Sequence, residues 1–278
     1  MYTIQKIREI EKTAIEIRKL SMELALLAGN NGAHIAPAFS IAEIMATLYK
    51  GVMRHDPKNP LWAERDRFIL SKGHAVLGLY TVLSLCGYFG WDLLKTFETT
   101  NSPLAGHPSK HVELGIECSA GSLGHGLSLA VGQAIGLKKR GIPANVYTLI
   151  GDGECNEGSN YEAALLARHM RLDNLVAIVD YNRLQSDGYS RDIIDTDLAA
   201  IWKALGWKVC EVNGHNVSEL YDVLHSRHQT VDTPYVVIAH TVKGKGVSFM
   251  EHAIGWHAGC LSQDDMVKAL TDMDGAWE

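Results

Sequence analysis

The sequence predicts an α/β protein with three layers, in which helices cover both faces of a mostly parallel central sheet. Three observations predict it. Apolar runs rich in β-branched residues recur along the chain, at residues 146–150, 175–179 and 234–240. Stretches of helix-forming composition separate these runs, so strands and helices alternate. A right-handed crossover between successive strands makes them parallel.

The remaining elements follow from periodicity and turn residues. Ser40 and Glu43 stand at the spacing of a capping box, and Ser159 or Asn160 is a candidate cap for the helix that follows. The expected strands are residues 66–72, 146–150, 175–179, 207–212 and 234–240. The expected helices are residues 1–28 (one helix or a pair), 40–50, 75–85, 127–140, 161–170, 193–205 and 217–229.

Composition fits one domain of this class and disfavours several other classes. The chain has 278 residues, of which 46% are hydrophobic, and no repeat or linker divides it, so we expect residues 1–278 to form a single domain. Mixed charges sum to −6, so neither nucleic acid nor a membrane is an expected partner. The chain shows no membrane span and no signal peptide. Its five scattered cysteines lack CxxC spacing, which favours a cytoplasmic protein with reduced thiols and disfavours a zinc site.

Polar side chains follow two successive strands within residues 146–188. Asp152 comes directly after the first strand, between Gly151 and Gly153, and Asn182 follows the second strand. Carboxyl ends of parallel strands meet at one edge of a sheet, where open α/β folds bind ligands. A carboxylate, an amide oxygen and a backbone carbonyl suit a hard cation such as Mg²⁺, which keeps other positions for water and phosphate oxygens. A simple tight turn is the alternative interpretation of the GDG tripeptide alone.

This stretch resembles a known cofactor motif. GDG followed by Asn 30 residues after the Asp (182 − 152 = 30) resembles the thiamine diphosphate motif, and the surrounding sequence resembles the transketolase family. The resemblance implies the thiamine diphosphate-binding fold. It also implies that Asp152, Asn182 and the backbone carbonyl of Leu184 hold Mg²⁺, for which Ca²⁺ or Mn²⁺ can substitute. Gly153 is then expected to lie against the diphosphate of the cofactor.

Other segments resemble the same family, above all DRFILSKGHA, GSLGHG, TVKGKG and GWHAG. The GSLGHG segment resembles the glycine loop whose backbone cups the cofactor. The cofactor-binding positions that this resemblance implies are His74, Gly121, Ser122, Leu123, Gly153, Asn182, Lys243 and His257. The catalytic positions that it implies are His34, His107, His257 and Glu157.

The implied catalytic residues have distinct roles. His34 is expected close to the substrate, His107 in the substrate channel, and Glu157 between the two cofactor sites of a dimer. Histidines suit the transfer of hydroxyl and carbonyl protons near neutral pH. Two positions depart from the family pattern: Pro37 replaces a small or hydroxyl residue, and His125 replaces the Gln of the glycine loop.

The resemblance covers only the first domain of the usual transketolase, so it implies the N-terminal subunit of a split enzyme. We expect this subunit to transfer a two-carbon ketol (glycolaldehyde) unit from a ketose (phosphate) donor to an aldose (phosphate) acceptor. Activity is expected only with a separate C-terminal subunit, in a heterotetramer with two copies of each chain. Pentose phosphate, apulose and sulfosugar metabolism all stay open, because the other subunit carries most of the discriminating residues.

Two alternatives also stay open. Another thiamine diphosphate enzyme, of the 2-oxo acid dehydrogenase E1 or 1-deoxyxylulose-phosphate synthase type, shares the GDG and Asn residues; pyruvate turnover without ketose turnover would favour it. A non-catalytic cofactor-binding scaffold is the second, and full cellular function of an Asp152→Ala variant would favour that. His215, His225 and His228 lie on different elements and are expected to be solvated, and His252 has no counterpart in the family pattern.

Overall fold

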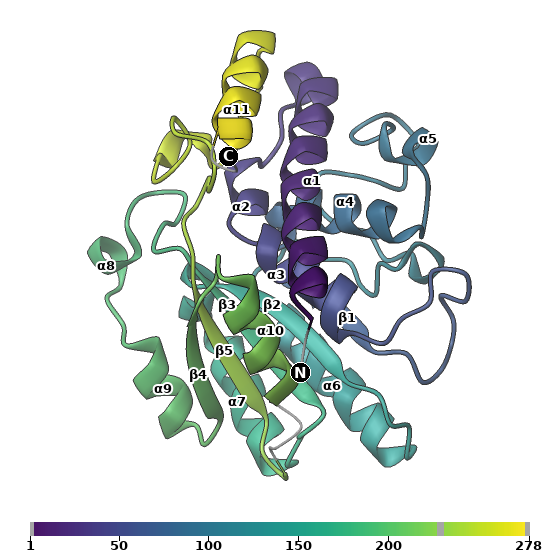
Figure 1. Ribbon diagram of the computed structural model, residues 1–278. Helices are drawn as coiled ribbons and strands as arrows, with labels where there is room; N and C mark the ends of the chain where they lie inside the picture. Colours follow the sequence, from purple (N-terminus) through teal and green to yellow (C-terminus); the bar gives the residue numbers. More distant parts are fainter. Residues whose placement is uncertain (1–2, 227–230, 276–278) are drawn as a thin grey trace.

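The computed structural model describes residues 3–226 and 231–275, and a five-stranded sheet lies at the centre of this part (Figure 1). The strand order is β1-β2-β3-β5-β4, and every neighbouring pair is parallel. The strands are β1 (Arg67–Leu70), β2 (Val146–Gly151), β3 (Leu175–Tyr181), β4 (Lys208–Asn213) and β5 (Tyr235–His240). The five expected strands are therefore confirmed.

Helices pack on both faces of this sheet. In the described residues they are α1 (Ile4–Ala28), α2 (Ala36–Phe39), α3 (Ala42–Thr47), α4 (Val76–Cys86), α5 (Trp91–Leu94), α6 (Gly126–Lys139), α7 (Gly158–His169), α8 (Ser190–Ile193), α9 (Leu198–Ala204), α10 (Val217–Ser226) and α11 (Gln263–Gly275). Residues 1–28 thus contain one long helix, α1, rather than a pair.

The three layers exist because the central strands are apolar on both sides. Tyr147 and Leu149 of β2 join a buried cluster with α1, α3, α4 and α10, whereas Val146 and Ile150 join a second cluster with α6, α7 and α9. Every residue of β2 is buried, as is typical of a parallel strand covered on both faces. The predicted three-layer α/β/α fold is confirmed, and Figure 1 shows the sheet between the two helical layers.

Long-range partners replace the local caps that the sequence predicted. The Ser40 hydroxyl donates to Asp180 Oδ2 at 2.7 Å, and Glu43 accepts from Arg18 at 2.7 Å, so the expected capping box does not form. The helix expected over residues 161–170 begins earlier, at Gly158, which places both candidate caps inside its first turn. Those caps were wrong because the side chains have other partners: the Ser159 hydroxyl donates to the Gly124 carbonyl at 2.8 Å, and Asn160 Nδ2 donates to the Glu154 carbonyl at 2.7 Å.

The helix expected over residues 193–205 is divided. It ends as α8 at Ile193 and restarts as α9 at Leu198, where the Asp197 side chain accepts from the Ala200 N–H at 2.9 Å. An Asp at such an N-cap competes with helix continuation, which explains the break. The helix expected over residues 217–229 is described only as far as Ser226.

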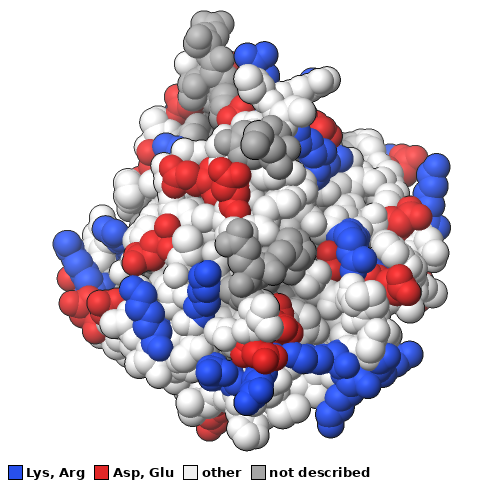
Figure 2. All heavy atoms as spheres, turned by 60° about the horizontal axis from the view of Figure 1, so that its bottom comes forward, with Lys and Arg blue, Asp and Glu red and all other residues white. Residues whose placement is uncertain are grey.

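Charged side chains of both signs are interspersed on the face shown in Figure 2, which agrees with their mixed order along the chain. Within residues 3–226 and 231–275, none of the helices combines the length and apolarity that a membrane crossing requires.

The start of α6 packs against the end of β1 so closely that only glycine fits. The Gly126 N–H donates to the Ser71 hydroxyl at 3.1 Å, and a Cβ on Gly126 would lie 2.3 Å from the Ser71 Cβ. We expect Gly126→Ala to destabilise the chain by ~1–3 kcal/mol, because overpacking forces the backbone to move. Gly132→Ala is the matched control in the same helix, where a Cβ meets open space; it should stabilise by ~0.5–1 kcal/mol. Thermal unfolding of both variants measures this, and equal melting temperatures would contradict the packing argument.

Candidate active site

Two neighbouring strands bring Asp152 and Asn182 to the carboxyl edge of the sheet. β2 is paired with β3 up to its last residue, Gly151, which lies opposite Asp180, so the loops that begin with Asp152 and Asn182 are adjacent. Asp152 Oδ2 accepts hydrogen bonds from the Arg183 N–H and the Ser190 hydroxyl, both at 2.8 Å. These bonds fix the carboxylate of the first loop to the backbone and side chains of the second.

The Asn182 side chain is oriented by two further hydrogen bonds. Its Nδ2 donates to Asp180 Oδ2 at 2.8 Å, and its Oδ1 accepts from the Leu184 N–H at 3.0 Å. The Leu184 carbonyl accepts from Lys243 Nζ at 3.2 Å. Hydrogen bonds therefore connect the three predicted metal ligands within one pair of loops, and the amide oxygen of Asn182 faces residue 184.

This donor set fits a hard divalent cation. The Lys243 ammonium already places a positive charge against the Leu184 carbonyl. Burial, followed by the nearby Asp180 carboxylate, raises the pKa of Asp152 to about 6, so a cation there would offset an unfavourable negative charge. In the described part of the chain no group of three or more His, Cys, Asp or Glu side chains is placed to bind a metal. The predicted set is of a different kind, because it combines one carboxylate with an amide and a carbonyl.

Four predicted histidines, which come from distant parts of the sequence, meet next to these loops. The centroid of the His34 ring lies 5.3 Å from that of His257, 5.4 Å from that of His107 and 5.9 Å from that of His74. The His74 and His257 rings are 5.1 Å apart. Loops and short 3-10 turns carry all four, so the fold rather than local sequence assembles the cluster.

Burial keeps three of these imidazoles neutral, those of His34, His74 and His257. It lowers the pKa of His34, together with the adjacent His107 and Lys243, and it lowers the pKa of His74 further. Burial and then the Lys243 ammonium lower the pKa of His257 to about 3. Neutral imidazoles at pH 7 can accept a proton from a hydroxyl group or donate one to a carbonyl oxygen.

Lys243 connects the histidine cluster to the predicted metal ligands. Its side chain is almost completely buried, and Nζ lies 2.7 Å from His257 Nδ1 as well as 3.2 Å from the Leu184 carbonyl. Burial, followed by the nearby Lys72 ammonium, lowers the pKa of Lys243 to about 8. The ammonium is therefore a buried positive charge that lies between the histidine cluster and the predicted metal ligands.

The glycine loop lies against the same cluster. Gly121 has a φ of +143°, and a Cβ there would lie 3.3 Å from the His107 ring. Ser122 is exposed and Leu123 is half-buried. A Cβ on Gly153 would lie 2.7 Å from Gln185 Cγ, so the Gln185 side chain covers this glycine.

One buried amide has the character of a ligand donor. Among the described residues, Gln185 Nε2 is buried and has no hydrogen-bond partner. A buried N–H without a partner is costly, and an anionic oxygen above Gly153 would satisfy it. The residues present therefore fit a diphosphate as well as a cation.

The other predicted positions lie at the periphery. Glu157 is exposed, directly before α7 and beside Gly124 of the glycine loop. Pro37 is buried in the first turn of α2, and its carbonyl oxygen lies 3.0 Å from the Ser40 hydroxyl. His125 is exposed, with Nδ1 3.2 Å from the Leu123 carbonyl.

Comparison with known proteins decides the family. A family profile described as "Transketolase, thiamine diphosphate binding domain" matches residues 10–276. The chain belongs to the transketolase family. It is 43% identical over 268 residues to one subunit of the apulose-4-phosphate transketolase of Actinobacillus succinogenes, covering 95% of this chain and 96% of that relative. It is 38% identical to the 6-deoxy-6-sulfo-D-fructose transketolase subunit SqwG of Clostridium sp., with 96% of each chain covered.

Solved transketolase structures share the fold. The transketolase from Leishmania mexicana superposes with a TM-score of 0.88 at 30% identity, over 95% of this chain and 41% of that one. The predicted membership of the transketolase family and the predicted fold are thus confirmed, and the relatives place the chain among transferases. This chain corresponds to the thiamine diphosphate-binding part of a transketolase.

A buried ion pair that the sequence did not predict lies beneath the candidate site. Lys72 Nζ contacts Asp180 Oδ2, and both side chains are almost fully buried. The hydroxyls of Ser40 and Thr241 also donate to the Asp180 carboxylate. Burial opposes this charge, but Lys72 and the hydrogen bonds lower the pKa of Asp180. Asp180 thus remains an acceptor for Asn182, and a charged residue directly after an apolar run was the only sequence signal.

Glu154 is the second omission. Its Oε1 accepts from the Ser71 hydroxyl and from the Gly124 N–H, the latter at 2.9 Å, while Oε2 accepts from the Gly151 N–H at 3.0 Å. This buried carboxylate ties the glycine loop to the ends of β1 and β2. No local pattern distinguishes it, because two of its three partners, Ser71 and Gly124, are 83 and 30 residues away in the sequence.

The structure also corrects the interpretation of His215. The sequence predicted a solvated side chain, whereas Nδ1 lies 2.9 Å from Glu43 Oε2 and Nε2 accepts from the Val242 N–H at 2.8 Å. His225 is partly buried and stacks on Tyr221. His228 lies outside the described residues.

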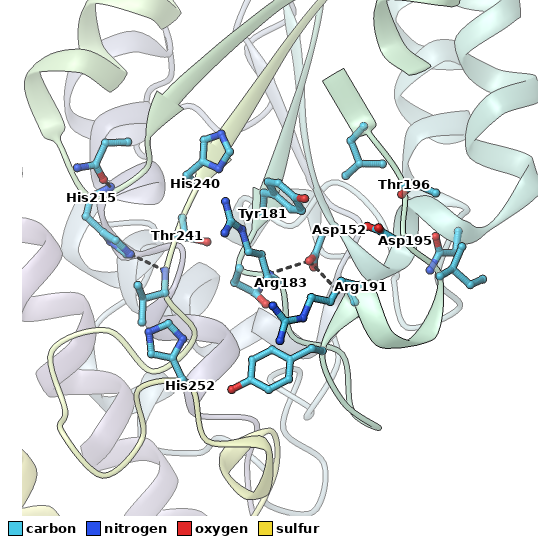
Figure 3. A pocket seen from close by; sticks show the side chains of 18 residues that line it. Asp152, Tyr181, Arg183, Arg191, Asp195, Thr196, His215, His240, Thr241 and His252 are labelled. Carbon is cyan, nitrogen blue, oxygen red and sulfur yellow. Dashed lines mark hydrogen bonds between the residues drawn. The ribbon is translucent and has the colours of Figure 1, made fainter. Parts of the chain in front are cut away.

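A cavity of about 670 Å³ opens beside the predicted metal ligands. Figure 3 shows Asp152 between Arg183 and Arg191 on one side, and His215, His240 and His252 on the other. Among the described residues that line this cavity, none belongs to the cluster of four histidines. The cavity therefore reaches the Asp152 and Asn182 loops without including the histidine cluster in its walls.

The lowered histidine pKa values predict acid sensitivity of the cofactor-free chain. Between pH 6.5 and about pH 3 the unfolded state binds a proton at residue 257 that the folded state does not, so stability falls as pH falls through this window. The unfolding free energy of the His257→Gln variant should depend less steeply on pH, because up to one fewer proton is taken up on unfolding. Urea unfolding from pH 7 to pH 4.5 measures that slope. An unchanged slope would show that residue 257 titrates normally in the fold.

Proposed function

We propose that this chain binds thiamine diphosphate through Mg²⁺ and, with a separate C-terminal subunit, transfers a two-carbon ketol unit from a ketose (phosphate) to an aldose (phosphate). The observation that carries the proposal is the position of Lys243. Its Nζ contacts both His257 and the Leu184 carbonyl, so the proton-transfer cluster and the predicted cation ligands belong to one site. Residues 1–278 are taken to act as one domain around that site.

The side chains divide the work between binding and proton transfer. Asp152, Asn182 and the Leu184 carbonyl would hold Mg²⁺, which suits this oxygen set. Bound thiamine diphosphate supplies the carbanion chemistry that protein side chains lack. His74, Lys243 and the glycine loop (Gly121, Ser122 and Leu123) would bind the diphosphate side of the cofactor.

Three histidines are left for the sugar. His34, His107 and His257 lie together, and burial keeps His34 and His257 neutral, so these two can hold a hydroxyl proton of the ketose and return it to a carbonyl oxygen. Several positioned imidazoles also fix the orientation of a polyhydroxylated substrate. Positioning of this kind lowers the entropic part of the barrier.

The partner is inferred from the relatives. Two relatives of matching length are named as subunits of transketolases. By contrast, the chain covers only 41% of the solved transketolase chain from Leishmania mexicana. We propose a heterotetramer with two copies of each subunit, in which exposed Glu157 reaches the second cofactor site. Five free cysteines also favour a reducing compartment, which we take to be the cytoplasm.

Reconstitution tests the proposal. The chain is assayed alone and with the C-terminal subunit, against phosphorylated and sulfonated ketoses and against pyruvate, with thiamine diphosphate and Mg²⁺. We expect ketose-dependent transfer only when both chains, the cofactor and the metal are present. Turnover by this chain alone would refute the split site. Turnover of pyruvate without ketoses would favour the 2-oxo acid alternative.

A further inference from the structure

His215 connects a buried carboxylate to the backbone that carries Lys243. It comes from the turn after β4, and its Nε2 accepts from the Val242 N–H at 2.8 Å (Figure 3). Its Nδ1 lies 2.9 Å from Glu43 Oε2 on α3. We propose that His215 is a positioning residue of the cofactor site, which holds Val242 and thereby fixes the place of Lys243.

The surroundings allow only one form of the His215 ring. Burial alone would raise the pKa of Glu43, but Arg18 and His215 lower it to about 2, so the Glu43 carboxylate can only accept hydrogen bonds. His215 Nδ1 must then carry the hydrogen. Nε2 must be the acceptor, because it faces the Val242 N–H. A neutral ring with its hydrogen on Nδ1 satisfies both neighbours, whereas no other protonation state does.

The carboxylate is itself firmly held. Arg18 Nη2 donates to Glu43 Oε2 at 2.7 Å and to the Phe39 carbonyl at 3.0 Å. Arg18 and Glu43 are both buried, on α1 and α3. The chain of contacts therefore runs from two core helices through His215 to the loop after β5.

Lys243 needs such support because its burial is unfavourable. An isolated buried ammonium is strongly destabilised relative to water, so the backbone must prevent the side chain from swinging out. Main-chain bonds hold the residues that follow: the His252 N–H donates to the Lys243 carbonyl and the Gly244 N–H to the Ala36 carbonyl, both at 3.1 Å. His215 adds a side-chain bond on the preceding residue.

The turn that carries His215 is shaped to close against β5. A Cβ on Gly214 would lie 2.4 Å from Thr241 Cγ2, so glycine is required there. The Gly214 N–H donates to the His240 carbonyl at 2.8 Å, and the His215 N–H donates to Asn213 Oδ1 at 3.0 Å. These contacts aim the imidazole at residue 242 before any ligand is present.

The inference rests on the proposed binding of thiamine diphosphate. Two substitutions of His215 remove its two side-chain hydrogen bonds one at a time. His215→Asn keeps a donor near the position of Nδ1 and loses the acceptor for Val242. His215→Gln keeps an acceptor near the position of Nε2 and loses the donor to Glu43. His225→Gln is the control, because His225 is partly buried on the next helix and contacts Tyr221 instead. Each variant is reconstituted with the partner subunit.

For His215→Asn we expect ~10-fold faster hydrogen exchange at the Val242 amide and a ~10-fold higher half-saturating concentration of thiamine diphosphate, the effect of about one hydrogen bond. Turnover at saturating cofactor should change less than ~2-fold, and the melting temperature should stay near that of the parent. His215→Gln should show the reverse: nearly normal exchange and cofactor affinity but a lower melting temperature. His225→Gln should match the parent in all four measurements.

Unchanged Val242 exchange in His215→Asn would overturn the inference, and so would parallel losses of stability and cofactor affinity in both His215 variants. Asp152→Asn is measured in the same series. If this variant saturates normally with thiamine diphosphate, the proposed function fails. If it fails to saturate while His215→Asn behaves like the parent, only the role of His215 is refuted.

Discussion

Asp152→Asn is expected to lower the turnover of the reconstituted enzyme by at least ~100-fold at fixed cofactor and Mg²⁺. Asp152 is the only carboxylate among the proposed metal ligands, and removing a charge from a divalent cation site costs several kcal/mol, at about 1.4 kcal/mol for each factor of ten. The half-saturating concentrations of Mg²⁺ and thiamine diphosphate should both rise. Steady-state assays with each component titrated in turn measure the effect.

The same substitution should not destabilise the cofactor-free chain. Burial and the neighbouring Asp180 disfavour a negative charge at residue 152, and an Asn can still accept from the Arg183 N–H. A stable but inactive variant is typical of a residue kept for function. Asp187→Asn, an exposed position on the adjacent loop that begins with Asn182, serves as the control and should behave like the parent. An active Asp152→Asn enzyme, or one that unfolds, would contradict this assignment.

Lys72→Met is expected to have the largest effect on stability. It removes one partner of the buried Lys72–Asp180 pair and leaves the Asp180 carboxylate uncompensated in the interior. Loss of one member of a buried pair costs ~3–5 kcal/mol, which corresponds to a fall of about 10 °C in melting temperature for a chain of this size. Calorimetry of the purified chain, without cofactor, measures the change directly.

Lys95→Met provides the matched control for that experiment. Lys95 also forms an ion pair, with Asp92, but both side chains are exposed to solvent. Exposed pairs contribute little, so its melting temperature should stay within about 1 °C of the parent. If the two substitutions changed the melting temperature equally, the buried Lys72–Asp180 pair would contribute no more to stability than an exposed ion pair.

The sequence predicted those features that depend on short segments. The apolar run before Asp152 and the one before Asn182 each identify a buried strand, and their shared edge follows from the crossover rule. His34, His74, His107 and His257 were placed together by family resemblance, and the structure brings their rings within 6 Å of a neighbour.

What the sequence could not predict depends on contacts between distant segments. Glu43 has the spacing of a helix cap, yet its partners are Arg18 and His215, 25 and 172 residues away. Asp180 likewise meets Lys72 across 108 residues. Local patterns carry no information on such pairs, because the alternative partner exists only once the helices have packed on the sheet.

A crystal of the reconstituted enzyme with Mn²⁺ and thiamine diphosphate tests the central claim most directly, through anomalous scattering from the metal. We predict one peak per site, within ~2.0–2.6 Å of a carboxylate oxygen of Asp152, the amide oxygen of Asn182 and the carbonyl oxygen of Leu184. A metal bound elsewhere, with Asp152 still hydrogen-bonded to Ser190 and Arg183 as it is without ligand, would contradict it.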